Sequence, residues 1–97
     1  MLGEKLKELR ETKGFLQRQV AAQLQVDTAY ISKMEHNEKP VSRNHLKKLS
    51  KVYSIPEAEL LPLWLADKVL QVIEKQQYGI EALKLVLNKL DNDKSKP

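Results

Sequence analysis

Apolar residues recur at intervals of three and four along roughly the first sixty residues, which is the period of an amphipathic helix. The pattern predicts helices over about residues 3–13, 17–24 and 28–36, a fourth that starts near Ser42 or Asn44, and a fifth that starts at Pro56. Gly14 and Asn37 stand where the first and third would end, since both residue types tolerate the left-handed conformation common there. No stretch alternates as a strand does, so the chain is predicted to be all-α.

The predicted helices over residues 17–24 and 28–36 are only about three residues apart, which is typical of a helix-turn-helix. Ala21 is small where one helix must cross the other closely, and Ile31 continues the apolar face. Asp27 stands where its carboxylate would cap the second helix. The outward positions of that helix are mostly small, polar or basic, which suits a helix that reads the major groove of DNA. Periodicity alone leaves open a helical bundle in which these residues only pack.

Residues 3–60 resemble the DNA-binding domain of the phage Cro and repressor family. The residues that carry the resemblance are Leu6, Leu9, Arg10, Gln17, Ala21, Leu24, Val26, Ile31, Ser32, Glu35 and Pro40. The family implies a five-helix domain that binds double-stranded DNA. Two positions depart from its pattern, because Gln25 replaces the usual Gly of the turn and Leu16 replaces the usual Ser or Thr cap. A side chain in the left-handed region costs roughly 1–2 kcal/mol, so a slightly reshaped turn is expected at Gln25.

The resemblance also implies which residues contact DNA. The expected contacts are Gln17, Arg18, Thr28, Ala29, Tyr30, Ser32, Lys33, Asn37, Lys39 and Arg43. The first two start the second helix, where side chains and amides hold a phosphate, and the last three are expected to clamp the DNA backbone. The listed residues from Thr28 to Lys33 are expected to face the groove. Tyr30 has two open roles, a phosphate contact or packing against the fourth helix. Arg10 and Glu35 are expected to form a buried structural salt bridge.

Charge and composition narrow the function further. Among 97 residues the net charge is +4, and the excess lies in residues 1–53, with 11 Lys and Arg against 6 Asp and Glu, while residues 54–97 carry 6 against 7. A basic half that holds the motif suits a nucleic-acid partner. The chain has no Cys, and His36 and His45 lack metal-ligand spacing. No catalytic constellation is visible, so no enzyme activity, cofactor or metal is expected.

The cellular location follows from the same sequence. No apolar run approaches the roughly 20 residues that span a bilayer, and the first residues lack the apolar segment of a signal peptide. A cytoplasmic, nucleoid-associated protein with no membrane partner is therefore expected.

Residues 61–90 form a different element, a helical extension with a long apolar stripe. Its expected dimer-interface residues are Leu65, Val69, Val72, Ile80, Leu83, Leu87 and Leu90. This stripe is more apolar surface than a monomer normally exposes, although a fold-back onto the domain over residues 1–60 stays open. Gly79 either separates two helices or weakens a longer one. Residues 91–97 are polar and are expected to form a disordered tail.

Together these features predict a transcriptional regulator that binds a palindromic operator in double-stranded DNA as a homodimer. In its short length, the chain is most similar to repressor-like controller proteins of restriction–modification systems. Two rival classes stay open. One is an antitoxin or adaptor that binds a protein partner through its C-terminal helices, and the other is an RNA-binding or purely structural helical protein.

Overall fold

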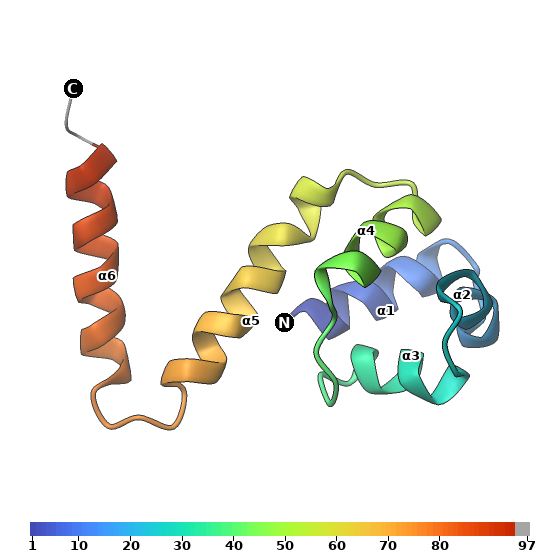
Figure 1. The fold of residues 1–97 in the computed structure, drawn as a ribbon, viewed down its shortest axis with the longest axis horizontal. Coiled ribbons are helices and arrows are strands. Elements are labelled where there is room, and N and C mark those ends of the chain that lie inside the picture. The colour runs from blue at the N-terminus through green and yellow to red at the C-terminus, as the bar shows by residue number, and fades with distance from the viewer. Residues whose placement is uncertain (95–97) are drawn as a thin grey trace. The chain divides into compact units, whose positions relative to one another are not determined.

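The computed structural model describes residues 1–94, and these form six α-helices and one 3₁₀ turn with no strand. The elements are α1 (Leu2–Thr12), α2 (Gln17–Leu24), α3 (Thr28–Glu35), α4 (Arg43–Val52), η1 (Glu57–Glu59), α5 (Leu61–Ile73) and α6 (Gly79–Lys94), shown in Figure 1. The all-α prediction, a helix-turn-helix domain followed by a helical extension, is confirmed. The chain divides into two compact units, Met1–Asp67 and the part from Lys68 onward, so the start of α5 belongs to the first unit.

The first unit is built around one apolar core, to which every helix from α1 to α4 contributes. The buried side chains are Leu2, Leu6, Leu9, Val20, Ala21, Leu24, Ile31, Met34, Val41, Leu46, Leu49, Tyr53 and Leu60. Phe15 packs its ring on Tyr53 at 6.2 Å between ring centroids, and burial raises the pKa of the Tyr53 hydroxyl to about 12. Trp64 of α5 packs on the same core and donates its indole N–H to the Val41 carbonyl at 2.6 Å. This contact anchors the start of α5 on the unit.

The fifth helix starts later than predicted. Pro56 is followed by a single 3₁₀ turn, Glu57–Glu59, and the α-helix starts only at Leu61. Leu60 is fully buried, and its N–H donates to the Glu57 carbonyl, the i to i+3 bond of a 3₁₀ turn. The sequence prediction was wrong here because Pro followed by acidic residues starts either kind of helix equally well.

The turn between α2 and α3 keeps its usual geometry although Gln25 replaces Gly. Gln25 has φ 58° and ψ 47°, which is the left-handed conformation. Two bonds close the end of α2, since the Gln25 N–H donates to Ala22 and the Val26 N–H donates to Ala21. This is the pattern of a Schellman motif. The reshaped turn expected from the sequence is therefore wrong, because the backbone bonds hold the conformation and Gln25 carries the strain.

Gln25→Gly is expected to raise the free energy of unfolding by about 0.5–1 kcal/mol. The left-handed conformation costs a side chain roughly 1–2 kcal/mol, and the greater freedom of Gly in the unfolded chain cancels part of the gain. Gln23→Gly is the matched control, since Gln23 is an exposed residue inside α2. This variant should lower the free energy of unfolding by about 1 kcal/mol. Thermal unfolding of both variants checks the opposite signs. Equal destabilisation by both would contradict the strain at Gln25.

The second unit contains the end of α5, a short connection and α6. α5 ends at Ile73 and α6 begins at Gly79, so Gly79 separates two helices. A Cβ atom on Gly79 would collide with the Ile73 carbonyl, so this close approach requires glycine. α6 continues to Lys94, with a Lys89–Asp93 ion pair at 3.6 Å one turn apart. Its last four residues lie in the segment expected to be disordered, and the rest of that segment lies outside the described residues.

Candidate DNA interface

The C-terminal end of α3 is held to α1 by the ion pair expected between Arg10 and Glu35. Arg10 Nε lies 2.7 Å from Glu35 Oε2, and Nη2 donates to Oε1 at 3.1 Å. The third nitrogen, Nη1, donates to the Phe15 carbonyl at 3.1 Å. The side chains are only 13% and 2% exposed. The hydrogen bond to Glu35 raises the pKa of Arg10, so the guanidinium stays charged where it is largely shielded from water.

Gln17 joins the same network from α2. Its Nε2 donates to Glu35 Oε1 at 3.1 Å, so one carboxylate binds residues of α1 and α2 to α3. The sequence predicted a phosphate contact for this side chain, whereas the structure uses its amide inside the domain. The first-turn backbone N–H groups of α2 have no carbonyl of their own helix to bond. Leu16 has no side-chain acceptor for these groups, and only the other half of a capping box is present, since Gln19 Oε1 accepts the Leu16 N–H at 2.8 Å.

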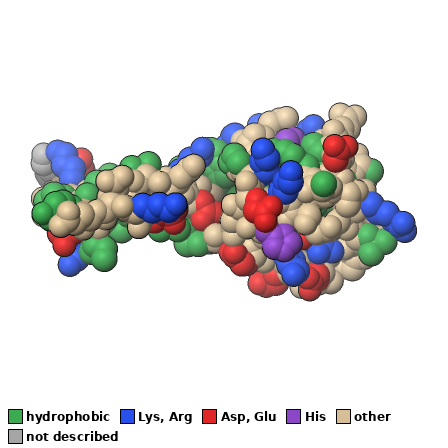
Figure 2. Space-filling model, turned by 90° about the horizontal axis from the view of Figure 1, so that it is seen from below, with side chains coloured by type: hydrophobic (Ala, Val, Ile, Leu, Met, Phe, Trp, Pro, Cys, Tyr) green, Lys and Arg blue, Asp and Glu red, His purple; other side chains and the backbone are tan. Residues whose placement is uncertain are grey.

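α3 has one buried and one exposed face. Ile31, Met34 and Glu35 are buried, whereas the sides that carry Thr28, Ala29 and Lys33 are exposed. The exposed residues are those that the sequence predicted to read the groove, together with Ser32, which is half-buried. Figure 2 shows Lys and Arg side chains scattered over one face of the domain, with Asp and Glu at several places among them.

The start of α3 differs from the sequence prediction in one detail. Asp27 occupies the N-cap position, but its side chain makes no capping hydrogen bond. Its backbone carbonyl instead accepts the Tyr30 and Ile31 N–H groups at 3.0 and 3.4 Å. Asp27 therefore begins the helix through its extended backbone and not through its carboxylate.

Tyr30 packs against α4, which is one of its two predicted roles. Its ring meets the His45 ring edge to face, with centroids 5.7 Å apart and an interplanar angle of 70°. Tyr30 is half-buried and belongs to the rim of the core. This contact braces α3 against α4.

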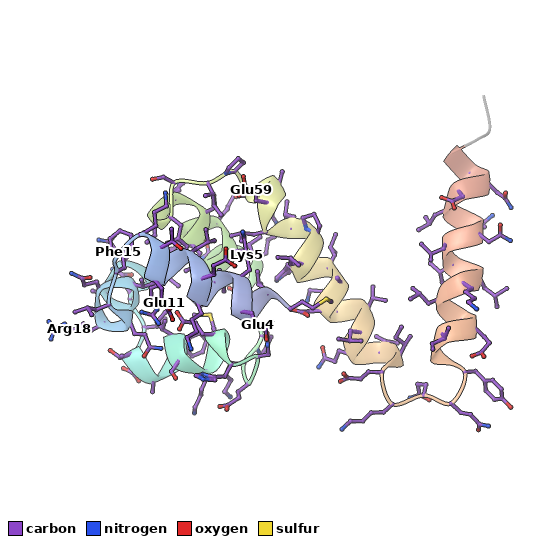
Figure 3. The ribbon with its side chains drawn as sticks, turned by 180° about the vertical axis from the view of Figure 1, so that it is seen from behind. Glu4, Lys5, Glu11, Phe15, Arg18 and Glu59 are labelled. Atoms are coloured by element: carbon purple, nitrogen blue, oxygen red, sulfur yellow. The ribbon has the colours of Figure 1, made fainter. Side chains whose placement is uncertain are left out.

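Besides Gln17, four residues were predicted to contact phosphates, and their side chains differ in exposure and in the bonds they already make. Arg18 is exposed and points away from the domain (Figure 3), and Lys39 is exposed in the loop after α3. Arg43 is also exposed, but its Nη2 pairs with Glu57 Oε2 at 3.0 Å. Arg18 and Lys39 thus offer charge to a phosphate more directly than Arg43 does.

Asn37, the fourth of these residues, has its side chain engaged within the domain. It has φ 60°, and its Oδ1 accepts the Gly3 N–H of α1 at 3.0 Å while its Nδ2 donates to Glu4. A Cβ atom on Gly3 would lie 2.5 Å from the Glu35 carbonyl, so α1 and the end of α3 touch here. Asn37 therefore caps α1 and fixes the loop, which leaves its side chain unsuited to clamping a phosphate.

The comparison with protein families decides the classification. The family model described as helix-turn-helix matches residues 6–60, which is more than half of the chain. The chain belongs to the helix-turn-helix family. It is a DNA-binding transcription regulator of the Cro and repressor type, with α2 and α3 as the paired helices. None of the curated proteins or solved structures matches the chain.

Sequence reasoning missed two contacts that set the position of α1 in this helix-turn-helix domain. One is the close approach at Gly3, for which a glycine in the first turn of an otherwise good helix was the available signal. The other is Asp67, whose Oδ2 accepts the Leu2 N–H at 2.9 Å from 65 residues away. No local pattern marks such a partner.

The described part of this helix-turn-helix protein holds no group of three His, Asp or Glu placed to bind a metal ion. None of its described helices combines the length and the apolar character needed to cross a membrane.

Proposed function

We propose that this helix-turn-helix regulator binds a two-fold symmetric operator in double-stranded DNA as a homodimer. The observation that carries the proposal is the division of α3 into a face fixed by Arg10, Gln17 and Glu35 and a face that leaves Thr28, Ala29 and Lys33 exposed. A helix held in this way reads bases in the major groove without having to become ordered first. Two copies would read half-sites about 34 Å apart.

The proposed contacts divide into base and phosphate contacts. Thr28 and Ala29 suit thymine methyl groups, and the Lys33 ammonium suits the acceptors of guanine. Arg18 and Lys39 suit phosphates, since both are exposed and basic, and phosphate contacts fix the register of the protein on the duplex. The Lys and Arg excess in residues 1–53 supports this arrangement.

The experiment begins with the DNA fragments that the purified protein retains, which give the operator for titration. Lys33→Ala and Thr28→Val are expected to change the preferred base at single positions, each by about 1–3 kcal/mol. Arg18→Ala and Lys39→Ala are expected to weaken binding to all sequences alike and to reduce its dependence on salt, because each removes one phosphate contact. Lys7→Ala removes the same charge from the surface of α1 and is the control.

Two results would contradict these assignments. If the four variants behave alike, the division into base and phosphate contacts is wrong. If affinity for duplex DNA does not fall as salt is added, binding does not depend on phosphate neutralisation and the proposed interface is wrong.

The homodimer is proposed on the exposed apolar side chains of the extension. Leu65, Val69 and Val72 of α5 are 53%, 44% and 71% exposed, and most of the apolar residues of α6 are similarly exposed. An antitoxin or adaptor role, in which another protein covers these side chains, is the second candidate because it uses the same exposure. Sedimentation of the purified chain separates the two, since a dimer of one polypeptide supports the homodimer.

Control of a restriction–modification operon is a narrower part of the proposal. It rests on the similarity to short Cro-type controller proteins. Retained fragments that lie upstream of a methyltransferase or endonuclease gene would support it, and fragments upstream of unrelated genes would exclude it.

A further inference from the structure

His36 lies on the exposed face of α3, although the sequence did not place it among the DNA contacts. It follows Ala29 and Lys33 at intervals of four and three residues, so the three side chains lie on the same side of the helix. All three are exposed, whereas Met34 and Glu35 face the core. The face proposed to meet DNA therefore continues to the last residue of α3.

The Nδ1 atom of the His36 ring has a fixed role. It lies 2.7 Å from the Ser32 carbonyl oxygen, which also accepts the His36 backbone N–H at 3.0 Å. A carbonyl oxygen has two lone pairs and no hydrogen, so it accepts both bonds and Nδ1 carries the hydrogen. The neutral ring then has its lone pair on Nε2. The bond to Ser32 is kept when the ring gains a proton, because Nδ1 is a donor in both forms.

Protonation of His36 therefore changes one atom, Nε2. In the neutral ring Nε2 is an acceptor and cannot bond a DNA phosphate, whose oxygens are acceptors too. In the imidazolium Nε2 carries a hydrogen and shares the positive charge, so it donates a charge-assisted hydrogen bond to a phosphate. Imidazole changes between these forms between about pH 5 and 8.

The position of His36 along α3 favours a phosphate over a base. In helix-turn-helix proteins the first residues of the reading helix contact the base edges, and His36 lies about 12 Å along the helix axis from Thr28. The loop after α3 folds back onto the same end, since the Glu38 and Lys39 N–H groups donate to the Lys33 carbonyl at 2.8 and 3.3 Å. His36 thus lies between Lys33 and Lys39, and Lys39 is already a proposed phosphate contact.

We propose that His36 contacts an operator phosphate only as the imidazolium, so that each half-site takes up a proton as DNA binds. This rests on the proposed function, because the phosphate belongs to the duplex that α3 reads. The affinity for the operator then rises as the pH falls, since the charged ring gains a contact that the neutral ring cannot make.

The other charged groups at this end of α3 do not supply the same pH dependence. They are Lys33, Glu38 and Lys39, together with Glu4 and the terminal amine of Met1, which approach Asn37 from α1. Lysine stays protonated and glutamate stays ionised between pH 6 and 8. Burial lowers the pKa of the terminal amine, but hydrogen bonds to Asp67 and Glu4 outweigh this effect and raise the pKa above its ordinary value.

The test measures the affinity of the full chain for its operator at pH 6 and pH 8 at constant salt. The parent is expected to bind about tenfold more tightly at pH 6, because each half-site gains an exposed opposite-charge contact that contributes about threefold. His36→Gln keeps a polar side chain but cannot gain a charge, so its affinity is expected to be equal at both pH values. His45→Phe removes the other histidine while it keeps a ring beside Tyr30, and this control is expected to retain the pH dependence.

Calorimetry reports the proton independently of affinity. Binding enthalpies measured at pH 7 in two buffers with different ionisation enthalpies give the number of protons taken up. Uptake is expected for the parent and for His45→Phe, and none is expected for His36→Gln. Circular dichroism of each variant confirms that the helices are kept.

Three outcomes would overturn the inference. If the parent binds duplex DNA equally well at both pH values and takes up no proton, the inference is wrong and the proposed function stands. If Glu38→Gln removes the pH dependence, the imidazolium acts by neutralising Glu38 and not by bonding a phosphate. If the parent binds no duplex DNA at either pH, the inference and the proposed function are both overturned.

Discussion

Arg10→Ala is expected to lower the free energy of unfolding by about 3–5 kcal/mol, because it leaves the buried Glu35 carboxylate without its charged partner. Glu35 is 2% exposed at its side chain and would keep only the Gln17 amide. The Phe15 carbonyl would lose its donor as well. Urea unfolding followed by circular dichroism measures the loss. The expected loss is most of the free energy of unfolding of a domain of this size.

Lys7→Ala is the matched control on the same helix. Its ion pair with Glu11, at 3.9 Å, joins side chains that are 52% and 57% exposed, so its loss should cost less than about 1 kcal/mol. Arg10→Met combined with Glu35→Leu removes both charges. This double variant should regain much of the free energy of unfolding that Arg10→Ala loses. A loss of under about 1 kcal/mol for Arg10→Ala would mean that Glu35 reaches water without its partner.

Leu83→Lys combined with Leu87→Lys is expected to give a folded monomer whose affinity for the operator is about 10²–10⁴-fold lower. Both residues lie in α6 and belong to the apolar stripe proposed as the dimer interface, and charges there oppose the association of two copies. The affinity falls because the second half-site no longer binds at the high effective concentration that a dimer provides. Light scattering and a DNA titration measure the two effects.

Leu85→Lys provides the control within α6. Leu85 is 71% exposed and is not one of the proposed interface residues, so this variant should stay dimeric and bind the operator as the parent does. If the double variant also stays dimeric, the interface lies elsewhere, and Pro56 to Leu63 becomes the best candidate. Unfolding of the first unit in the double variant would instead support the fold-back of the stripe onto the domain.

The sequence predicted the helices well because the information that places them is local. The predicted bounds of α2 are those of the structure, and the bounds of α1 and α3 differ from prediction by one residue. Apolar spacing, the left-handed positions at Gly14 and Asn37, and the short connection before Thr28 all act within a few residues. The start of the fifth helix was misplaced because the choice between 3₁₀ and α geometry depends on how Leu60 packs in the core.

The side-chain contacts that the sequence did not predict join residues that lie far apart in the chain. The sequence paired Arg10 with Glu35 only through the family resemblance, and it assigned Gln17, Asn37 and Arg43 to phosphates. In the structure Gln17 bonds Glu35, Asn37 bonds Gly3, and Arg43 pairs with Glu57. Each of these partners lies more than ten residues away in the sequence, where periodicity carries no information about contact. Exposure therefore moves the proposed phosphate contacts to Arg18 and Lys39.

The proposed base contacts all lie on the exposed face of α3, so operator preference could evolve there without loss of the fold. Thr28, Ala29 and Lys33 are exposed, and surface substitutions of this kind change stability by about 0.5 kcal/mol or less. Glu35, on the opposite face of the same helix, has no such freedom because Arg10 and Gln17 both bind it. With the proposed base contacts, a few substitutions on the exposed face would give a new operator preference, while the network at Glu35 is kept by selection for stability.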